Sequence, residues 1–164
     1  MIGWLNSLLN RLSAYRLVSV ALTALWVVTI VLSLVGIVDF SPLAAIVSGS
    51  VFLGVSTLSN RLIGMLYKLP PRYESSYITA LILFFVFTPS LDTGALLAFT
   101  AAAIISSLSK YILTIRSRHI FNPAAVAVVL VGILGLTPAS WWIATPVLAP
   151  ATLIFAFLIL YKTR

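Results

Sequence analysis

The residues best suited to chemistry lie from Lys110 to Pro123, where three basic side chains and the single histidine precede an Asn-Pro pair. Asn122 is a favoured helix N-cap, and proline suits the first helical position because its missing N–H is not needed there. The other N–H groups of that turn then face the preceding cations. This pattern predicts an anion site, for a phosphate or a flavin phosphate. The alternative is that cap and charges only set membrane orientation, with His119 an interfacial residue.

The residue inventory excludes most other redox and metal sites. The chain has no cysteine and one histidine, and its three acidic residues are scattered at positions 39, 74 and 92. Iron–sulfur clusters need cysteine thiolates, and zinc needs several nitrogen, oxygen or sulfur ligands. The sequence therefore predicts no haem held by two of its own histidines, no Fe-S cluster, no zinc and no thiol catalysis.

The composition is typical of an integral membrane protein. Of the 164 residues, 62% are hydrophobic and 8% are charged, whereas soluble domains carry about 25% charged residues. The formal net charge of +7 does not indicate nucleic acid, because the sequence has no exposed basic helix or aromatic platform to bind it. We therefore expect the lipid bilayer as a partner and no nucleic acid.

The apolar runs predict an all-α integral membrane protein with about six transmembrane helices. A bilayer-crossing helix needs about 20 residues, and residues 17–164 are expected to form a single helical bundle. The third and fifth runs are short for a full crossing. The predicted spans are residues 17–38, 42–58, 77–90, 93–108, 123–136 and 146–161.

The charges predict the orientation of these spans. With the N-terminus in the cytoplasm, all ten Lys and Arg residues fall on the cytoplasmic side, and Asp39 and Asp92 fall outside, as the positive-inside rule requires. If residues 123–136 did not cross, the basic C-terminus would lie outside. The pattern favours six crossings, N-in and C-in, in the plasma (inner) membrane, with Trp141 and Trp142 in an outer aromatic belt.

Residues 1–16 have apolar side chains at three- and four-residue spacing, with Asn6, Asn10 and Arg11 on the other side. This is typical of an interfacial amphipathic helix; the alternative is the start of the first span. The spans themselves have no ionisable residue away from their ends, which disfavours an intramembrane carboxylate relay. Redox or transport work then needs a bound cofactor or a partner.

The segment SKYILTIRSRHIFNPAAVAVVL, residues 109–130, resembles the part of the NqrB/RnfD family that holds its Asn-Pro-Ala motif. The stretches SNRLIGMLYKLP, ESSYITALILFFVFTPS and ASWWIATP agree in character. Members are membrane subunits of the sodium-translocating NADH:quinone reductase and of Rnf-type electron transport complexes. Their fold has about ten helices in two related halves, similar to urea transporters, so about six spans predict a short or truncated member.

The resemblance implies a bound flavin, FMN or riboflavin, with Lys110, His119 and Asn122 as contacts to its phosphate or isoalloxazine. Family members attach FMN through a threonine, and the nearest match here is Thr145 in Ala-Thr-Pro. The match departs from the motif, because Ile143 stands where glycine is expected and Ala139 where an aspartate is expected. The alternative at Thr145 is a tight interhelical turn.

The function implied is that of an RnfD/NqrB-like membrane subunit that positions a flavin for electron transfer coupled to ion translocation. Such a chain is a non-catalytic or flavin-carrying subunit of an oxidoreductase complex, because the cofactor carries the chemistry. Its expected partners are other membrane subunits or a second copy, and a cytoplasmic reductase or flavoprotein. The alternatives are a half-size small-solute transporter or channel-like module, and a membrane anchor for a soluble reductase.

Overall fold

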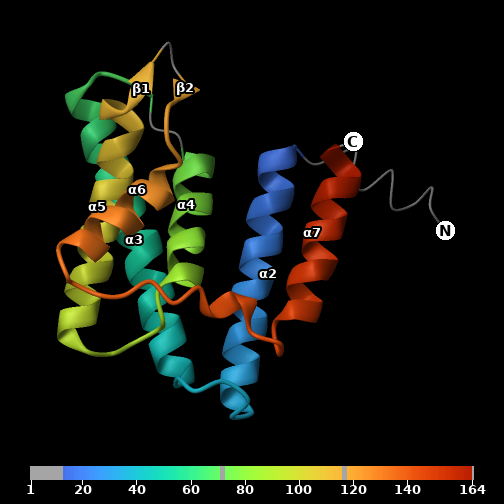
Figure 1. Ribbon diagram of the computed structural model, residues 1–164. Helices are drawn as coiled ribbons and strands as arrows, with labels where there is room; N and C mark the ends of the chain where they lie inside the picture. Colours follow the sequence, from blue (N-terminus) through green and yellow to red (C-terminus); the bar gives the residue numbers. More distant parts are fainter. Residues whose placement is uncertain (1–12, 71–72, 116–117, 164) are drawn as a thin grey trace.

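The computed structural model describes residues 13–70, 73–115 and 118–163, and this part of the chain is all-α apart from one short β-hairpin (Figure 1). The predicted amphipathic helix falls mostly on residues 1–12, which lie outside the described residues. The helices are α2 Ala14–Leu34, α3 Pro42–Leu66, α4 Tyr73–Val86, α5 Thr93–Ile112, α6 Pro123–Ile133 and α7 Ala149–Thr163. The hairpin strands are β1 Thr114–Ile115 and β2 Arg118–His119, and a 3-10 turn, η1, covers Trp142–Ala144.

Three of these helices are long and apolar enough to cross a membrane. Helices α2, α3 and α5 have 21, 25 and 20 residues, and at about 1.5 Å per residue each spans the roughly 30 Å of a hydrocarbon core. The chain is therefore a multi-pass membrane protein. Helix α3 extends to Leu66, past the predicted end at residue 58. The polar residues 59–61 end the apolar run, but they remain helical. Asn60 is buried within the helix and Arg61 is exposed.

Helix α6 has 11 residues, so at about 1.5 Å per residue it is about 16 Å long, half the thickness of the hydrocarbon core. It ends in a Schellman motif: Gly135 has φ +66° and donates to the Gly132 carbonyl, and Leu136 donates to the Val131 carbonyl. Glycine adopts this left-handed conformation without steric cost. Residues 134–141 are non-helical, and α7 begins at Ala149 rather than at the predicted residue 146.

Helix α4 lies at the centre of the bundle and is buried on nearly all sides. Its last two turns, from Ala80 to Val86, pack against the core aromatic side chains. Phe52 from α3 contacts Phe87 and Phe99 at ring-centroid distances of 6.1 and 5.0 Å. In Figure 1, α7 lies beside α2 at one side of this core. Because α4 contacts α2, α3, α5 and α6, any site inside the bundle has α4 as one of its walls.

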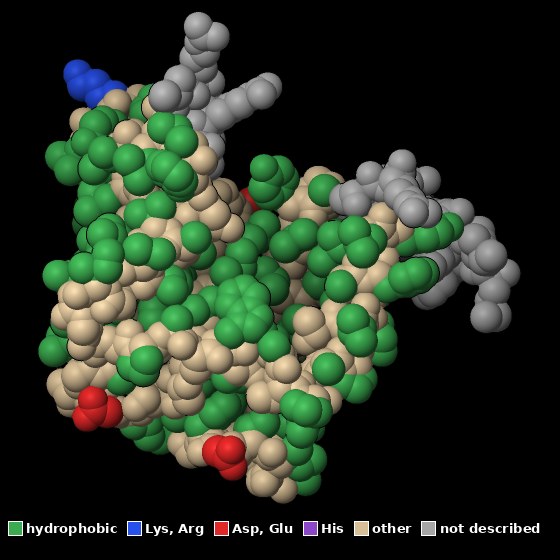
Figure 2. Space-filling view, viewed as in Figure 1, with side chains coloured by type: hydrophobic (Ala, Val, Ile, Leu, Met, Phe, Trp, Pro, Cys, Tyr) green, Lys and Arg blue, Asp and Glu red, His purple; other side chains and the backbone are tan. Residues whose placement is uncertain are grey.

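The two ends of the bundle differ in charge. In Figure 1 the hairpin lies at the same end as the start of α2 and α4 and the ends of α3, α5 and α7; we call this the hairpin end. The 35–41 and 87–92 connections form the opposite, loop end. Arg16, Lys68 and Lys110 belong to the hairpin end, and Asp39 and Asp92 to the loop end. Figure 2 shows acidic side chains along the lower edge and mainly hydrophobic side chains across the face between the ends.

Candidate functional site

Lys110 is buried in the last turn of α5 and joins that helix to α4. Its Nζ donates to the backbone carbonyl of Ser75 and to Oγ of Ser76, both at 3.1 Å, and the residue is 5% exposed. A buried ammonium group is tolerated only where hydrogen bonds replace its hydration. Two of its three N–H donors therefore hold the first turn of α4, where sequence reasoning expected a loop cation facing a ligand.

Asn122 caps α6 as the sequence predicts. Its Oδ1 accepts a hydrogen bond from the Ala124 N–H at 2.9 Å, and Pro123 occupies the first helical position. The cap also limits the anion site expected here. Pro123 has no N–H and Ala124 uses its own in the cap, so Ala125 supplies the remaining N–H of this turn. Fewer backbone N–H groups are therefore available to bind a phosphate than the sequence predicts.

A groove lies beside this cap, between α4, the start of α2 and the start of α6. Its volume is about 350 Å³, and its polar lining comes from Tyr15, Ser75, Thr79 and Asn122. Ile120 and Phe121, which precede the cap, are part of the apolar lining. We call this the α6-cap groove. Because Lys110 binds the Ser75 carbonyl, the groove and the lysine meet at the same turn of α4.

The other two predicted site residues do not join this group. His119 lies on β2, and its side chain lies outside the described residues. Thr145 follows η1, is exposed, and its carbonyl accepts hydrogen bonds from Leu148 and Ala149. This is the tight interhelical turn of the alternative interpretation. Thr145 directly follows η1, which packs against α4. The neighbouring residues 140 and 141 bind the carbonyl of Val86 at the end of α4, eleven residues or about 16 Å along the helix from Ser75. Covalent FMN at Thr145 therefore stays a prediction without a link to the groove.

A polar seam between α3 and α5 was missed by sequence reasoning. The Tyr111 hydroxyl lies 2.8 Å from Asn60 Oδ1 and 3.1 Å from the Asn60 carbonyl, and Ser107 Oγ donates to the Ser56 carbonyl at 3.4 Å. Within the described residues, Ser56 Oγ and Asn60 Nδ2 are buried without a partner. The spacing in the sequence could have indicated this seam. The polar residues are four apart in each helix, Ser56 and Asn60 on α3 and Ser107 and Tyr111 on α5, and residues four apart lie on one face of a helix.

A second internal site forms where α4 ends. The backbone N–H groups of Ser140 and Trp141 both donate to the Val86 carbonyl, at 2.9 and 3.0 Å. The Trp142 indole N–H donates to the Phe84 and Phe87 carbonyls, at 3.0 and 2.9 Å. We call residues 140–142 the α4-capping segment. Buried backbone carbonyls need hydrogen-bond partners, and the α4-capping segment supplies them for the end of α4.

The structure thus has a mainly apolar groove with a few polar side chains at the hairpin end. Nearer the loop end, the end of α4 is capped by hydrogen bonds from residues 140–142. Searches against protein-family models, curated protein sequences and solved structures find no match to this chain. Support for a function therefore comes from these two features and from the resemblance of residues 109–130 alone.

Proposed function

We propose that the chain crosses the membrane six times, with both termini in the cytoplasm and the hairpin end facing inward. Three facts support this orientation. Basic residues belong to the hairpin end, Asp39 and Asp92 belong to the loop end, and α7 ends at the hairpin end (Figure 1). Cytoplasmic loops are enriched in Lys and Arg. In this topology α6 and residues 134–148 together make the fifth crossing, in the plasma (inner) membrane.

We further propose that the protein is an RnfD/NqrB-like membrane subunit of an electron-transport complex and binds a flavin, FMN or riboflavin, in the α6-cap groove. The groove carries this proposal. Its volume of about 350 Å³ falls in the range of about 300–1,000 Å³ found for small-molecule sites. It combines apolar walls with a few convergent polar groups, and it opens at the end that a cytoplasmic donor would reach.

The roles of the residues follow from their hydrogen bonds. Asn122 Oδ1 is committed to the helix cap, so its Nδ2 group donates to a phosphate or ring carbonyl. Thr79 Oγ1 donates to the Ser75 carbonyl at 2.7 Å, so its remaining lone pairs accept from ring N–H groups. Lys110 fixes the first turn of α4, which carries Ser75 of the groove lining. The flavin supplies the redox chemistry when bound, and the chain orients it toward other membrane subunits, a second copy or a cytoplasmic reductase or flavoprotein.

The test is whether flavin stays with the protein. Expressed with its natural membrane partners and purified in mild detergent, the protein should retain a flavin absorbance band. Asn122→Ser keeps a good capping side chain but removes the amide donor, and should lower flavin retention by about tenfold, equivalent to one charge-assisted hydrogen bond of about 1.4 kcal/mol. Asp92→Ser is the matched control, because it changes another helix N-cap in the same way at the loop end.

A second candidate is a half-size small-solute transporter or channel-like module. It is favoured by the helix break, since α4 and α6 both end within the bundle and discontinuous helices are typical of transporter binding sites. A second copy or second subunit would complete the path. A colourless protein that mediates solute flux in liposomes would support this function and contradict the flavin proposal.

A further inference from the structure

A second groove runs between α2 and α4, and the α6-cap groove is separate from it. Its upper part, about 510 Å³, is lined by Arg16, Ser19, Tyr73, Glu74 and Tyr77 among others. Its lower part, about 670 Å³, is lined mainly by apolar residues of α2. The two parts share Ser19, Val20 and Tyr77, so they form one continuous groove with a polar mouth and an apolar floor.

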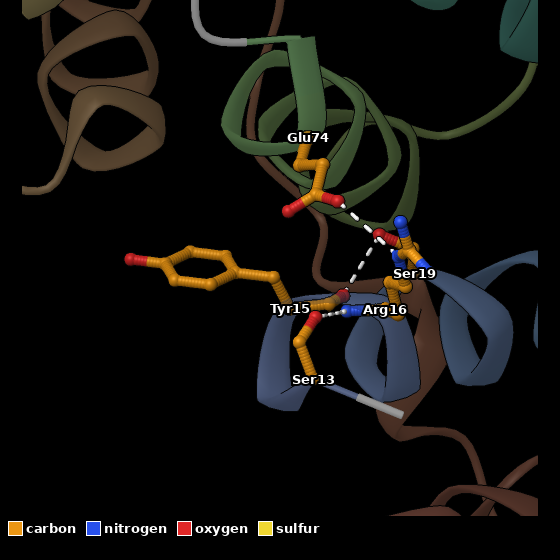
Figure 3. Close-up of polar contacts among 5 residues, drawn as sticks. All are labelled: Ser13, Tyr15, Arg16, Ser19 and Glu74. Atoms are coloured by element: carbon orange, nitrogen blue, oxygen red, sulfur yellow. Dashed lines mark hydrogen bonds and ion pairs between the residues drawn. The ribbon is translucent and has the colours of Figure 1, made fainter. Parts of the chain in front are cut away.

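The mouth holds one cation and one anion that are only loosely paired. Arg16 Nε lies 3.6 Å from Glu74 Oε1, and the two side chains are 67% and 55% exposed. Charge-assisted hydrogen bonds are shorter, about 2.7–2.9 Å. Figure 3 shows Arg16 turned toward Glu74 across the gap between the helices, while the Tyr15 ring points away. The guanidinium and the carboxylate therefore keep donors and acceptors for a ligand.

The length of the groove matches one leaflet of a bilayer. Arg16 and Val28 are twelve residues apart on α2, a rise of about 18 Å along the helix. The hydrocarbon core is about 30 Å thick, so the groove extends from the interface to just past the midplane. The hydroxyl oxygens of Thr23 and Tyr77 are 2.9 Å apart. These two side chains lie between the polar mouth and the apolar floor, which is formed by Ala24 and Val27.

We propose that this groove binds a zwitterionic phospholipid with a phosphoethanolamine headgroup. The phosphate pairs with Arg16, the ammonium group pairs with Glu74, and one acyl chain lies along Val20, Ala24 and Val27. Charge complementarity selects this headgroup. A phosphatidylglycerol headgroup brings no cation for Glu74, and the quaternary ammonium of phosphatidylcholine has no N–H to donate to a carboxylate. The site depends on the membrane location of α2 and not on flavin binding.

The proposal is tested by measuring lipid retention with native mass spectrometry, after reconstitution in nanodiscs with equal amounts of phosphatidylethanolamine, phosphatidylcholine and phosphatidylglycerol. The wild-type protein should retain phosphatidylethanolamine about threefold more than either other lipid. All three lipids offer a phosphate to Arg16, so the preference rests on the ammonium–Glu74 pair alone, an exposed ion pair that contributes about 0.6 kcal/mol. The double variant Arg16→Gln with Glu74→Gln should lose that preference. It should still fold, since the exposed pair adds little to stability.

Two further variants distinguish binding of the acyl chain from a general effect of surface charge. Ala24→Trp fills the apolar floor and should lower retention of all three lipids at the site, while Lys68→Gln removes an exposed cation outside the groove and should change nothing. Equal retention of the three lipids by the wild type, a preference for phosphatidylglycerol, or an unchanged preference in the double variant would each overturn the proposal.

Discussion

Replacing Trp142 by alanine is expected to destabilise the protein by about 3–5 kcal/mol, the usual cost of truncating a buried aromatic side chain. Trp142 is 8% exposed, and its ring contacts Phe40, Phe84 and Phe85 at centroid distances of 5.1, 5.3 and 5.6 Å. The change also removes the donor that serves the carbonyls ending α4. Thermal unfolding in detergent should show a melting temperature lower by about 10 °C or more.

Two related variants identify the cause. Trp141→Ala changes the neighbouring residue, which is 57% exposed, and should alter stability by less than about 1 kcal/mol. Trp142→Phe keeps most ring contacts but leaves the carbonyls without the indole donor, and should cost about 1–3 kcal/mol. Equal losses at positions 141 and 142 would show that residues 140–142 do not cap α4 as described.

Replacing Gly49 by alanine should destabilise the protein by about 1–3 kcal/mol, because the added methyl overpacks a tight contact. A Cβ at this position of α3 would lie 2.5 Å from Cε2 and Cζ2 of Trp26. The Trp26 indole N–H donates to the Ala45 carbonyl at 3.1 Å, so moving the ring to relieve the clash also strains that bond. Close approach of α2 to α3 thus requires glycine here.

Gly54 on the same helix is the matched control. A Cβ at Gly54 meets nothing within 4 Å, and alanine is about 0.8–1.0 kcal/mol more favourable than glycine in a helix interior. Gly54→Ala should therefore raise the melting temperature slightly while Gly49→Ala lowers it. Shifts of the same sign and size would contradict the packing of Trp26 against α3.

The local features of this fold could be predicted from sequence. The apolar runs give the positions of α2 and α5 within a few residues, because length and hydropathy alone define a crossing helix. The Asn122-Pro123 pair gives the start of α6, because a capping side chain acts on its own first turn. These predictions need only neighbouring residues, which is why they succeed.

Features that depend on distant contacts could not be predicted. Trp141 and Trp142 are chemically identical neighbours expected in one aromatic belt, yet the path of residues 134–148 across α4 buries Trp142 and exposes Trp141. Lys110 was expected among loop cations, but its position against Ser75 and Ser76 follows from how α5 packs on α4. The groove beside Arg16 and Glu74 likewise exists only once α2 and α4 are assembled.

The six-crossing topology on which the proposed function rests can be measured directly, because the sequence contains no cysteine. Single cysteines at Asp39, Lys68 and Thr163 would be tested with a membrane-impermeant maleimide on intact cells and again after permeabilisation. We predict that Asp39→Cys is labelled in intact cells, while Lys68→Cys and Thr163→Cys are labelled only after permeabilisation. Labelling of Thr163→Cys from outside, with Lys68→Cys protected, would contradict six crossings and a cytoplasmic C-terminus.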